Sequence, residues 1–208
     1  MMKFEFERLD WAKADGLLPA IVQHALGGEV LMLGWMDREA LNATLASGQV
    51  TFFSRSKQRL WRKGETSGHV LDVTAIRADC DGDTLLITAT PQGPTCHIGT
   101  SSCFGEDVAP PLAFLAKLDA LVESRQAERP QDSYTTALFE RGVRRIAQKI
   151  GEEAVETALA ATGQDDRALL GEAADLLYHL SVLLRARGLS LSDVVAVLRQ
   201  RHSPRLPA

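Results

Sequence analysis

The chain has 208 residues, of which 45% are hydrophobic and 24% charged, and its formal net charge at pH 7 is −4. This composition is ordinary for a soluble globular protein, and the mildly acidic balance argues against wholesale binding of nucleic acid, which needs a basic surface. We expect residues 1–10, which alternate apolar and charged side chains, not to be a signal peptide. No apolar run approaches the length that crosses a bilayer. The composition therefore predicts a cytoplasmic protein with no membrane partner.

The first half of the chain consists of short runs of branched and aromatic residues separated by turns. Such runs predict β-strands at 17–24, 30–33, 50–54, 70–77 and 85–90. Between the second and third runs, Asp37 can cap a helix that extends over 37–46.

The second half has a different pattern. A linker is predicted at 106–111, because its two adjacent prolines cannot continue a helix or strand. After it, the hydrophobic period changes from two to 3.6 residues, which predicts helices at 112–125, 135–161, 166–187 and 191–201. Ser190 and Asp193 match a capping box before the last helix. We expect an α+β, β-rich domain over residues 1–107, followed by an all-α helical bundle over 112–208.

The three cysteines of the chain, Cys80, Cys96 and Cys103, lie close together in segments rich in Gly, Asp and Ser. An odd number of clustered cysteines favours a metal site in a reducing compartment over a disulfide framework. Three thiolates are one ligand short of a closed zinc shell, and zinc with an open fourth position is typical of catalytic sites. Water on such an ion becomes a nucleophile near neutral pH. The cysteines therefore predict a catalytic zinc centre.

Three aspartates surround the first cysteine, at Asp79, Asp81 and Asp83. Their carboxylates are hard oxygen ligands, which suit a second ion, most plausibly magnesium. The alternative is a hairpin turn, because Asp-Gly-Asp is a common turn sequence. An EF-hand loop is excluded, since Gly82 falls one place early and Thr90 stands where the loop needs a bidentate Glu.

The helical half carries a second acidic group. On a helical wheel, its members share one stripe of 135–161 or flank the leucine face of 166–187. The acidic residues are Glu152, Glu153, Glu156, Glu172 and Asp175, and the basic residues Arg145 and Lys149 lie on the same stripe of 135–161. If the two helices face each other, the carboxylates converge, and oxygen ligands alone favour Mg²⁺ that bridges phosphate oxygens. The alternative is a solvated charged face. We expect His179, on the same flank, to cap or pack rather than bind metal.

Several of these motifs resemble known enzyme families. The segments 34–37, 53–56, 60–68, 79–83, 92–99 and 101–104 resemble phosphoribosyl-AMP cyclohydrolase. The segments 133–135, 138–139, 149–153 and 172–176 resemble phosphoribosyl-ATP pyrophosphohydrolase. Taken together, the chain is similar over about residues 10–202 to the bifunctional histidine-biosynthesis enzymes that fuse the two.

The resemblance implies two consecutive reactions. The C-terminal domain cleaves phosphoribosyl-ATP between its α and β phosphates, giving phosphoribosyl-AMP and pyrophosphate. The N-terminal domain then adds water at C6 of the adenine and opens the ring between N1 and C6. The resemblance places zinc on the three cysteines and magnesium on the three aspartates. It also implies a homodimer, in which Cys80 of one subunit completes a zinc site with Cys96 and Cys103 of its partner.

The resemblance further implies roles for individual side chains. The residues expected to contact phosphate or ribose are Arg55, Lys63, Thr66 and Ser67. Trp61 is expected to shape the base pocket. His97 is a candidate general base or proton shuttle, because imidazole titrates near neutrality, or else it only hydrogen-bonds a turn. In the helical domain, Arg145 and Lys149 are expected to contact the substrate, and Glu153 and Glu156 are the candidates for catalysis.

Two other functions compete with this interpretation. One is a binding module, with a structural zinc site and a helical dimerisation unit. Its fourth zinc ligand would be His97, which should point away from Cys96 if the two lie in an extended strand. The other is a house-cleaning nucleotide pyrophosphohydrolase with a structural zinc domain, against which the cysteine-containing half argues.

Overall fold

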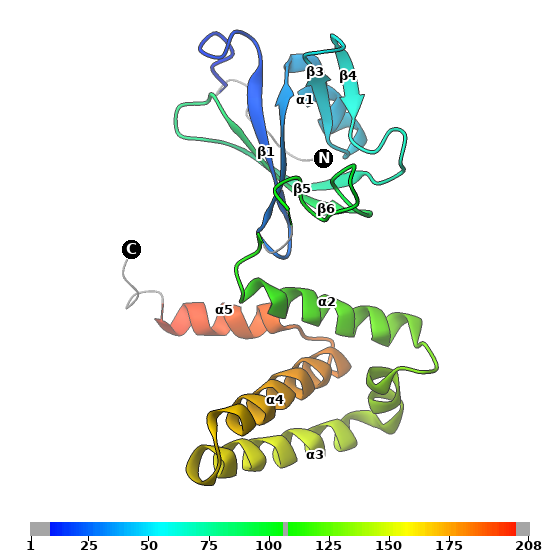
Figure 1. The fold of residues 1–208 in the computed structure, drawn as a ribbon, viewed down its shortest axis with the longest axis vertical. Helices are drawn as coiled ribbons and strands as arrows, with labels where there is room; N and C mark the ends of the chain where they lie inside the picture. Colours follow the sequence, from blue (N-terminus) through cyan, green and yellow to red (C-terminus); the bar gives the residue numbers. More distant parts are fainter. Residues whose placement is uncertain (1–8, 106–107, 203–208) are drawn as a thin grey trace. The chain divides into compact units, whose positions relative to one another are not determined.

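The computed structural model describes residues 9–105 and 108–202 of the chain (Figure 1). The chain separates into two compact units, Met1–Phe114 and Leu115–Ala208. In the described residues, the first unit contains six strands and one helix, and all the elements after it are helices. The expected fold class, a β-rich α+β region followed by an all-helical region, is confirmed. Of the predicted linker, residues 106–107 lie outside the described residues.

The main sheet of the first unit has four strands in the order β2-β1-β6-β5. Their bounds are Leu18–His24 (β1), Val30–Met36 (β2), Leu71–Ala78 (β5) and Leu85–Pro91 (β6). Strand β1 runs antiparallel to β2 and parallel to β6, while β5 and β6 are an antiparallel pair. The connection between β5 and β6 is therefore a turn at the end of a hairpin, and it carries the three aspartates and Cys80.

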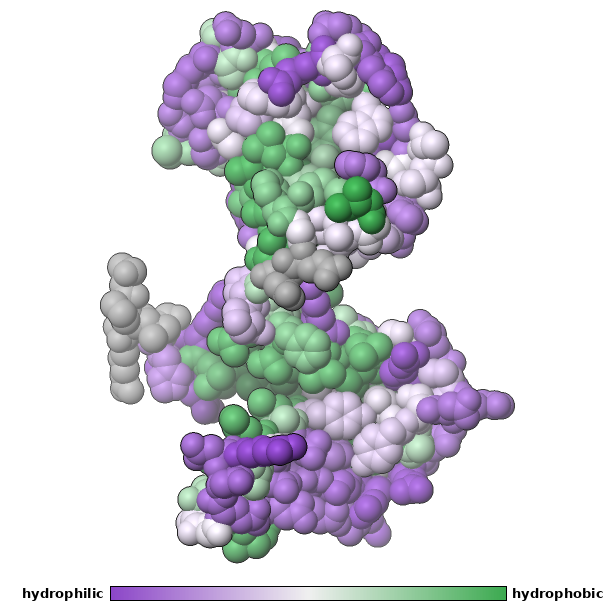
Figure 2. Space-filling view, in the orientation of Figure 1, coloured by the Kyte–Doolittle hydropathy of each residue, from purple (hydrophilic) through white to green (hydrophobic). Residues whose placement is uncertain are grey.

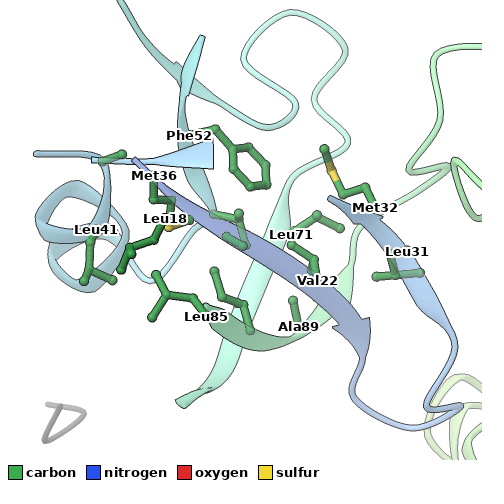
Figure 3. Packing of buried hydrophobic residues seen from close by; sticks show 14 of the residues in the cluster. Leu18, Val22, Leu31, Met32, Met36, Leu41, Phe52, Leu71, Leu85 and Ala89 are labelled. Atoms are coloured by element: carbon green, nitrogen blue, oxygen red, sulfur yellow. The ribbon is translucent and has the colours of Figure 1, made fainter. Parts of the chain in front are cut away.

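Alternate residues of the central strands β1 and β6 form the core of this unit (Figure 3). The fully buried members are Leu18, Ala20, Val22, Leu85, Ile87 and Ala89. This period of two is why the sequence predicted these strands well. Strand β2 continues through Gly34, beyond the predicted 30–33. A Cβ at Gly34 would lie 2.3 Å from the Phe52 ring, so glycine lets this ring pack against the strand.

A second sheet pairs β3 (Thr51–Ser54) with β4 (Arg59–Arg62). Strand β4 was not predicted, because its four residues begin and end with arginine and show no apolar alternation. Its position comes from pairing across the hairpin, where Trp61 lies opposite Phe52 and the two rings stack at 5.7 Å. Helix α1 (Arg38–Ser47) begins as predicted, since the Asp37 carboxylate accepts a hydrogen bond from the Ala40 N–H at 2.7 Å.

The second unit contains α2 (Ala113–Glu128), α3 (Tyr134–Gly163), α4 (Asp166–Ala186) and α5 (Leu191–His202). Helix α3 is broken at Gly142, whose φ of 78° and ψ of 171° are not helical. The prediction of one continuous helix over 135–161 was wrong at this residue. The core of the unit is formed by Val122, Leu138, Ile146 and Val182. The capping box is confirmed, because Ser190 and Asp193 exchange side-chain to backbone hydrogen bonds at 2.8 and 3.3 Å.

A buried ion pair joins α2 to α4. Asp119 is only 4% exposed and accepts hydrogen bonds from the Arg185 guanidinium at 3.3 and 2.5 Å and from the Ser181 hydroxyl at 2.9 Å. Glu123 meets the same guanidinium at 3.0 Å. Each carboxylate oxygen of Asp119 therefore has a partner, which is the condition for burying a charge.

Within the described residues, no helix is long and apolar enough to cross a membrane.

Candidate active sites

A pocket of about 480 Å³ in the first unit brings together most of the predicted site residues of that half. The predicted residues that line it are Trp61, Lys63, Thr66, Ser67, Cys96, His97 and Cys103. They come from two segments, the end of β4 with the loop after it, and the loop after β6. Arg55, Cys80 and the three aspartates are not among its lining residues.

Strand β4 and its following turn place Lys63 in the pocket. The Lys63 N–H donates to the Val50 carbonyl oxygen at 2.9 Å, which extends the pairing beyond the strand. The Lys63 side chain is only 7% exposed, and its Nζ donates to the His69 carbonyl oxygen at 3.4 Å. A Cβ at Gly64 would lie 2.5 Å from the His69 backbone, so glycine is required for this close approach. Burial lowers the pKa of Lys63, an effect that the Cys103 and Cys96 thiols oppose.

Two of the three cysteines lie together in the same pocket. The Cys103 N–H donates to the Leu31 carbonyl oxygen at 2.8 Å, which fixes this cysteine beside β2. Its side chain lines the same pocket as that of Cys96. Burial raises the pKa of the Cys103 thiol, and the neighbouring Cys96 raises it further. The backbone N–H of Ile98 lowers the pKa of Cys96, which makes its thiolate the more accessible of the two.

His97 lies closer to Cys96 than expected. The segment is a turn and not a strand, because the Cys96 N–H donates to Thr100 at 3.0 Å and its carbonyl accepts from Gly99 at 3.1 Å. The His97 Nδ1 is 3.8 Å from the Cys96 sulfur, and the ring lines the pocket. The condition under which His97 would point away from Cys96, an extended strand, is therefore not met.

The three aspartates form a cluster in the β5–β6 turn, with carboxylate oxygens within 4.8 Å of one another. Asp79 accepts hydrogen bonds from the N–H groups of Asp83 and Thr84 at 3.1 and 3.2 Å, so the predicted hairpin turn is confirmed. Lys13 donates to Asp81 and lies 2.5 Å from an oxygen of Asp83. These hydrogen bonds from Lys13 lower the pKa of both carboxyls. The cluster thus already contains one cationic partner, and a magnesium ion there stays a prediction.

Cys80 and Arg55 lie apart from the pocket. Cys80 is exposed in the aspartate turn, and the described residues contain no group in which all three cysteines converge. The guanidinium of Arg55 lies 4.4 Å from the centre of the Trp35 ring, a cation–π contact outside the pocket lining. Within one copy of the chain, neither residue joins the predicted partners.

In the second unit, three of the five predicted carboxylates converge. The oxygens of Glu153 and Glu156 on α3 and of Glu172 on α4 lie within 4.8 Å of one another. Glu152 is held aside by Arg145 at 3.2 Å and by Lys149 at 3.1 Å. Asp175 is exposed and does not belong to the group. The helices therefore bring part of the predicted set together, as facing stripes should.

The carboxylates of this cluster differ in their charged neighbours, since Lys149 pairs with Glu153 and not with Glu156. Lys149 lies 2.6 Å from Glu153 and lowers its pKa, although Glu153 is only 4% exposed. Glu156 is exposed, but partial desolvation raises its pKa, and the neighbouring Glu153 and Glu172 raise it further. Two carboxylates in one cluster with opposite pKa shifts suit a site in which one group binds a cation readily and the other holds a proton longer.

His179 lies beneath this cluster and packs as expected. Its side chain is buried, and Nδ1 lies 2.8 Å from the Asp175 carbonyl oxygen, which can only accept a hydrogen bond. Nδ1 therefore carries the proton, and Nε2 is left to accept from the Tyr134 hydroxyl at 3.3 Å. The same Nδ1 is 3.7 Å from Glu153, so His179 borders the carboxylates.

Sequence patterns did not single out two further pocket residues, His69 and Thr95. His69 directly follows the motif at 60–68, and its ring packs against Gly93, where a Cβ would lie 2.7 Å away. Thr95 precedes Cys96, and only its burial shows its importance. His69 lies directly after the motif at 60–68 and Thr95 lies inside the motif at 92–99, but neither position by itself gives a role to the side chain.

Comparison with known families gives the same division of the chain. A family model described as phosphoribosyl-AMP cyclohydrolase matches residues 32–105, and one described as phosphoribosyl-ATP pyrophosphohydrolase matches residues 115–202. Among relatives named histidine biosynthesis bifunctional protein HisIE, the chain is 69% identical to that of Xylella fastidiosa (strain Temecula1) over 194 residues, covering 93% of each chain. It is 61% identical to that of Escherichia coli (strain K12), covering 93% of this chain and 95% of the relative.

Two matched hydrolase families in one chain define a bifunctional hydrolase. The chain belongs to the family of bifunctional histidine-biosynthesis enzymes that join a phosphoribosyl-AMP cyclohydrolase to a phosphoribosyl-ATP pyrophosphohydrolase.

Proposed function

We propose that residues 112–208 hydrolyse phosphoribosyl-ATP to phosphoribosyl-AMP and pyrophosphate, and that residues 1–107 then open the adenine ring of phosphoribosyl-AMP in a zinc-dependent step. The observation that carries this proposal is the pocket where Cys96 and Cys103 meet a buried Lys63. Two thiols that line one pocket are soft donors suited to zinc, and a buried ammonium suits a phosphorylated substrate.

The donor set fits zinc only if a third thiolate reaches the pocket. Cys80 is exposed on its turn and lies outside the pocket of its own chain. A second copy of the chain is therefore the natural source of the third ligand, which supports a homodimer with a shared zinc site. When bound, zinc would lower the pKa of a coordinated water enough to supply a nucleophile near neutral pH.

The side chains of the pocket have complementary tasks in ring opening. Lys63 and the hydroxyls of Thr66 and Ser67 bind the phosphate and ribose groups. Trp61, held by its stack on Phe52, provides a flat apolar surface for the base. His97, beside Cys96, accepts the proton that the attacking water loses. Arg55 would take part only if the partner subunit or the substrate reaches it.

In the helical domain, the convergent carboxylates of Glu153, Glu156 and Glu172 are the ligands for Mg²⁺, and the oxygen-only donor set fits that ion. Arg145 and Lys149 flank the cluster and offset the negative charge of the substrate phosphates. Glu152 and Asp175 point elsewhere in this chain, so their predicted roles as ligands require a rearrangement on metal binding. A second Mg²⁺ on Asp79, Asp81 and Asp83 requires displacement of Lys13.

Exposed apolar surface supports association of two copies. Figure 2 shows hydrophobic residues gathered over α2 and α5 on the visible face of the helical unit. Leu121 of α2 and Val195 and Leu198 of α5 are between 47% and 48% exposed. Apolar patches of this kind are typical of surfaces that bind a partner. We therefore include a homodimer in the proposal, together with a cytoplasmic location that suits unpaired cysteines.

Incubation of the purified protein with phosphoribosyl-ATP tests the function. We expect pyrophosphate release with Mg²⁺, followed by the absorbance change of adenine ring opening, and about one zinc per chain by elemental analysis. Removal of zinc should stop the second reaction and leave the first. Ring opening at the wild-type rate after verified removal of zinc would contradict the zinc-dependent assignment.

A further inference from the structure

Thr95 combines two properties that rarely occur together. It lines the pocket of the first unit, yet it is only 2% exposed. Its hydroxyl oxygen Oγ1 has no hydrogen-bond partner in the protein. Two other buried polar atoms without partners, Trp11 Nε1 and Thr136 Oγ1, belong to residues that do not line this pocket. In the described part of the chain, Thr95 is thus the pocket residue whose buried hydroxyl is left without a partner.

Folding alone does not explain a hydroxyl at this position. A buried hydroxyl that lacks a hydrogen bond destabilises a protein relative to a methyl group of the same shape. Valine has nearly the shape of threonine and would fill the same space without this cost. The chain therefore supplies no partner for the Thr95 hydroxyl, and a ligand or water that enters the pocket can supply one.

The neighbourhood of Thr95 indicates which part of a ligand it meets. Its chain neighbour Cys96 lines the same pocket as Cys103, and both are proposed zinc ligands. The carbon attacked in ring opening must come close to these sulfurs, because the nucleophile is generated there. The pocket also holds Lys63, a second buried polar side chain, which is suited to a phosphate.

We propose that the Thr95 hydroxyl is a substrate-contacting group that hydrogen-bonds the reacting end of the purine, at the C6 position of phosphoribosyl-AMP. This inference rests on the proposed cyclohydrolase function. During the reaction the oxygen of water bonds to C6 and the N1–C6 bond breaks with its electron pair going to N1. One proton of the water goes to a base and the other to N1. A hydroxyl can accept from the amino group on C6 and donate to the new oxygen.

A matched pair of variants tests the proposal. Thr95→Val removes the hydroxyl and keeps the shape, whereas Thr95→Ser keeps the hydroxyl. We expect Thr95→Val to lower kcat/KM for ring opening by about 10-fold to 100-fold, and Thr95→Ser to stay within a few fold of wild type. Release of pyrophosphate from phosphoribosyl-ATP, measured on the same chain, should be unchanged in both.

Two readouts separate substrate contact from a structural role. The zinc content and Tm of Thr95→Val should equal those of wild type, or the Tm should rise, because an unpaired buried hydroxyl has been removed. Zinc-depleted Thr95→Val should bind phosphoribosyl-AMP about 5-fold to 20-fold more weakly than zinc-depleted wild type in calorimetry. Wild-type kcat/KM and affinity in Thr95→Val, or a marked fall in its Tm, would overturn the proposal. A wild-type chain that leaves supplied phosphoribosyl-AMP intact would instead remove the proposed function beneath it.

Discussion

The ammonium of Lys149 lies 2.6 Å from the buried carboxylate of Glu153, within the cluster that also contains Glu156 and Glu172. The chain thus supplies its own cation to the group of acids where we propose that Mg²⁺ binds. This pairing has a measurable consequence, since a fixed positive charge next to a ligand oxygen opposes binding of a second cation.

We predict that Lys149→Gln binds Mg²⁺ more tightly than wild type in the absence of substrate, by about 3-fold to 10-fold, because one competing charge has been removed. The same variant should have a higher KM for phosphoribosyl-ATP, since a cation that offsets the phosphates is lost. Calorimetric titration with Mg²⁺ and steady-state kinetics measure the two effects. Equal Mg²⁺ affinities would argue against metal binding at Glu153.

Glu156→Gln should abolish hydrolysis of phosphoribosyl-ATP and leave ring opening of supplied phosphoribosyl-AMP intact. The matched control is Glu140→Gln on the same helix, an exposed position outside the cluster, which should keep both activities. A pyrophosphohydrolase rate near wild type in Glu156→Gln would reject the placement of this site.

Glu156 also predicts a dependence of stability on pH. Its pKa is raised in the folded chain by partial desolvation and by the neighbouring carboxylates. The stability that the protonated group contributes is therefore complete below the ordinary pKa of Glu and is lost as pH rises through the raised value. In metal-free buffer, Glu156→Gln should thus have a higher Tm than wild type at pH 7, and the difference should shrink at acidic pH. A lower Tm of the variant at pH 7 would be inconsistent with clustered negative charge.

Asp119→Ala should destabilise the helical unit strongly, by about 3–5 kcal/mol, because it leaves the Arg185 guanidinium without its buried partner. Denaturant unfolding followed by circular dichroism measures this loss. Asp193→Ala, which removes only an exposed cap on α5, is the comparison and should cost about 1 kcal/mol. Similar losses of unfolding free energy in the two variants would show that the buried ion pair stabilises the unit no more than the exposed helix cap does.

The elements that the sequence predicted well are those with a clear period or cap. Strands β1 and β6 alternate buried and half-buried residues, and Asp37 caps α1 with its own side chain. Strand β4 escaped prediction because pairing with β3, and not its own residues, makes it a strand. The break in α3 at Gly142 was not predicted, because a glycine inside a helical pattern does not by itself indicate a positive φ.

For the candidate sites, residue types were predictable and contacts were not. The sequence could place Cys96 and Cys103 in one pocket, but whether Cys80 joins them depends on a second copy of the chain. The direction of His97 was predicted only for an extended strand, and the segment is a turn in which His97 lies beside Cys96. Thr95 could not be found, since an unpartnered hydroxyl is recognised only when the atoms around it are known.

Sharing of the zinc site between subunits can be tested by complementation. Cys80→Ser and Cys96→Ser chains should each be inactive in ring opening, and their mixture should regain up to about a quarter of wild-type activity if heterodimers form at random with one intact site of two. Subunit exchange must be verified by mass spectrometry of differently tagged chains. No recovery in exchanged heterodimers would mean that one chain supplies all the ligands.

The most direct test of the zinc-dependent cyclohydrolase is the pair of rates in Cys103→Ser, because a hydroxyl is a poor zinc ligand at neutral pH. We predict that ring opening of phosphoribosyl-AMP disappears while pyrophosphate release from phosphoribosyl-ATP continues at the wild-type rate. Ring opening close to the wild-type rate in this variant would contradict it.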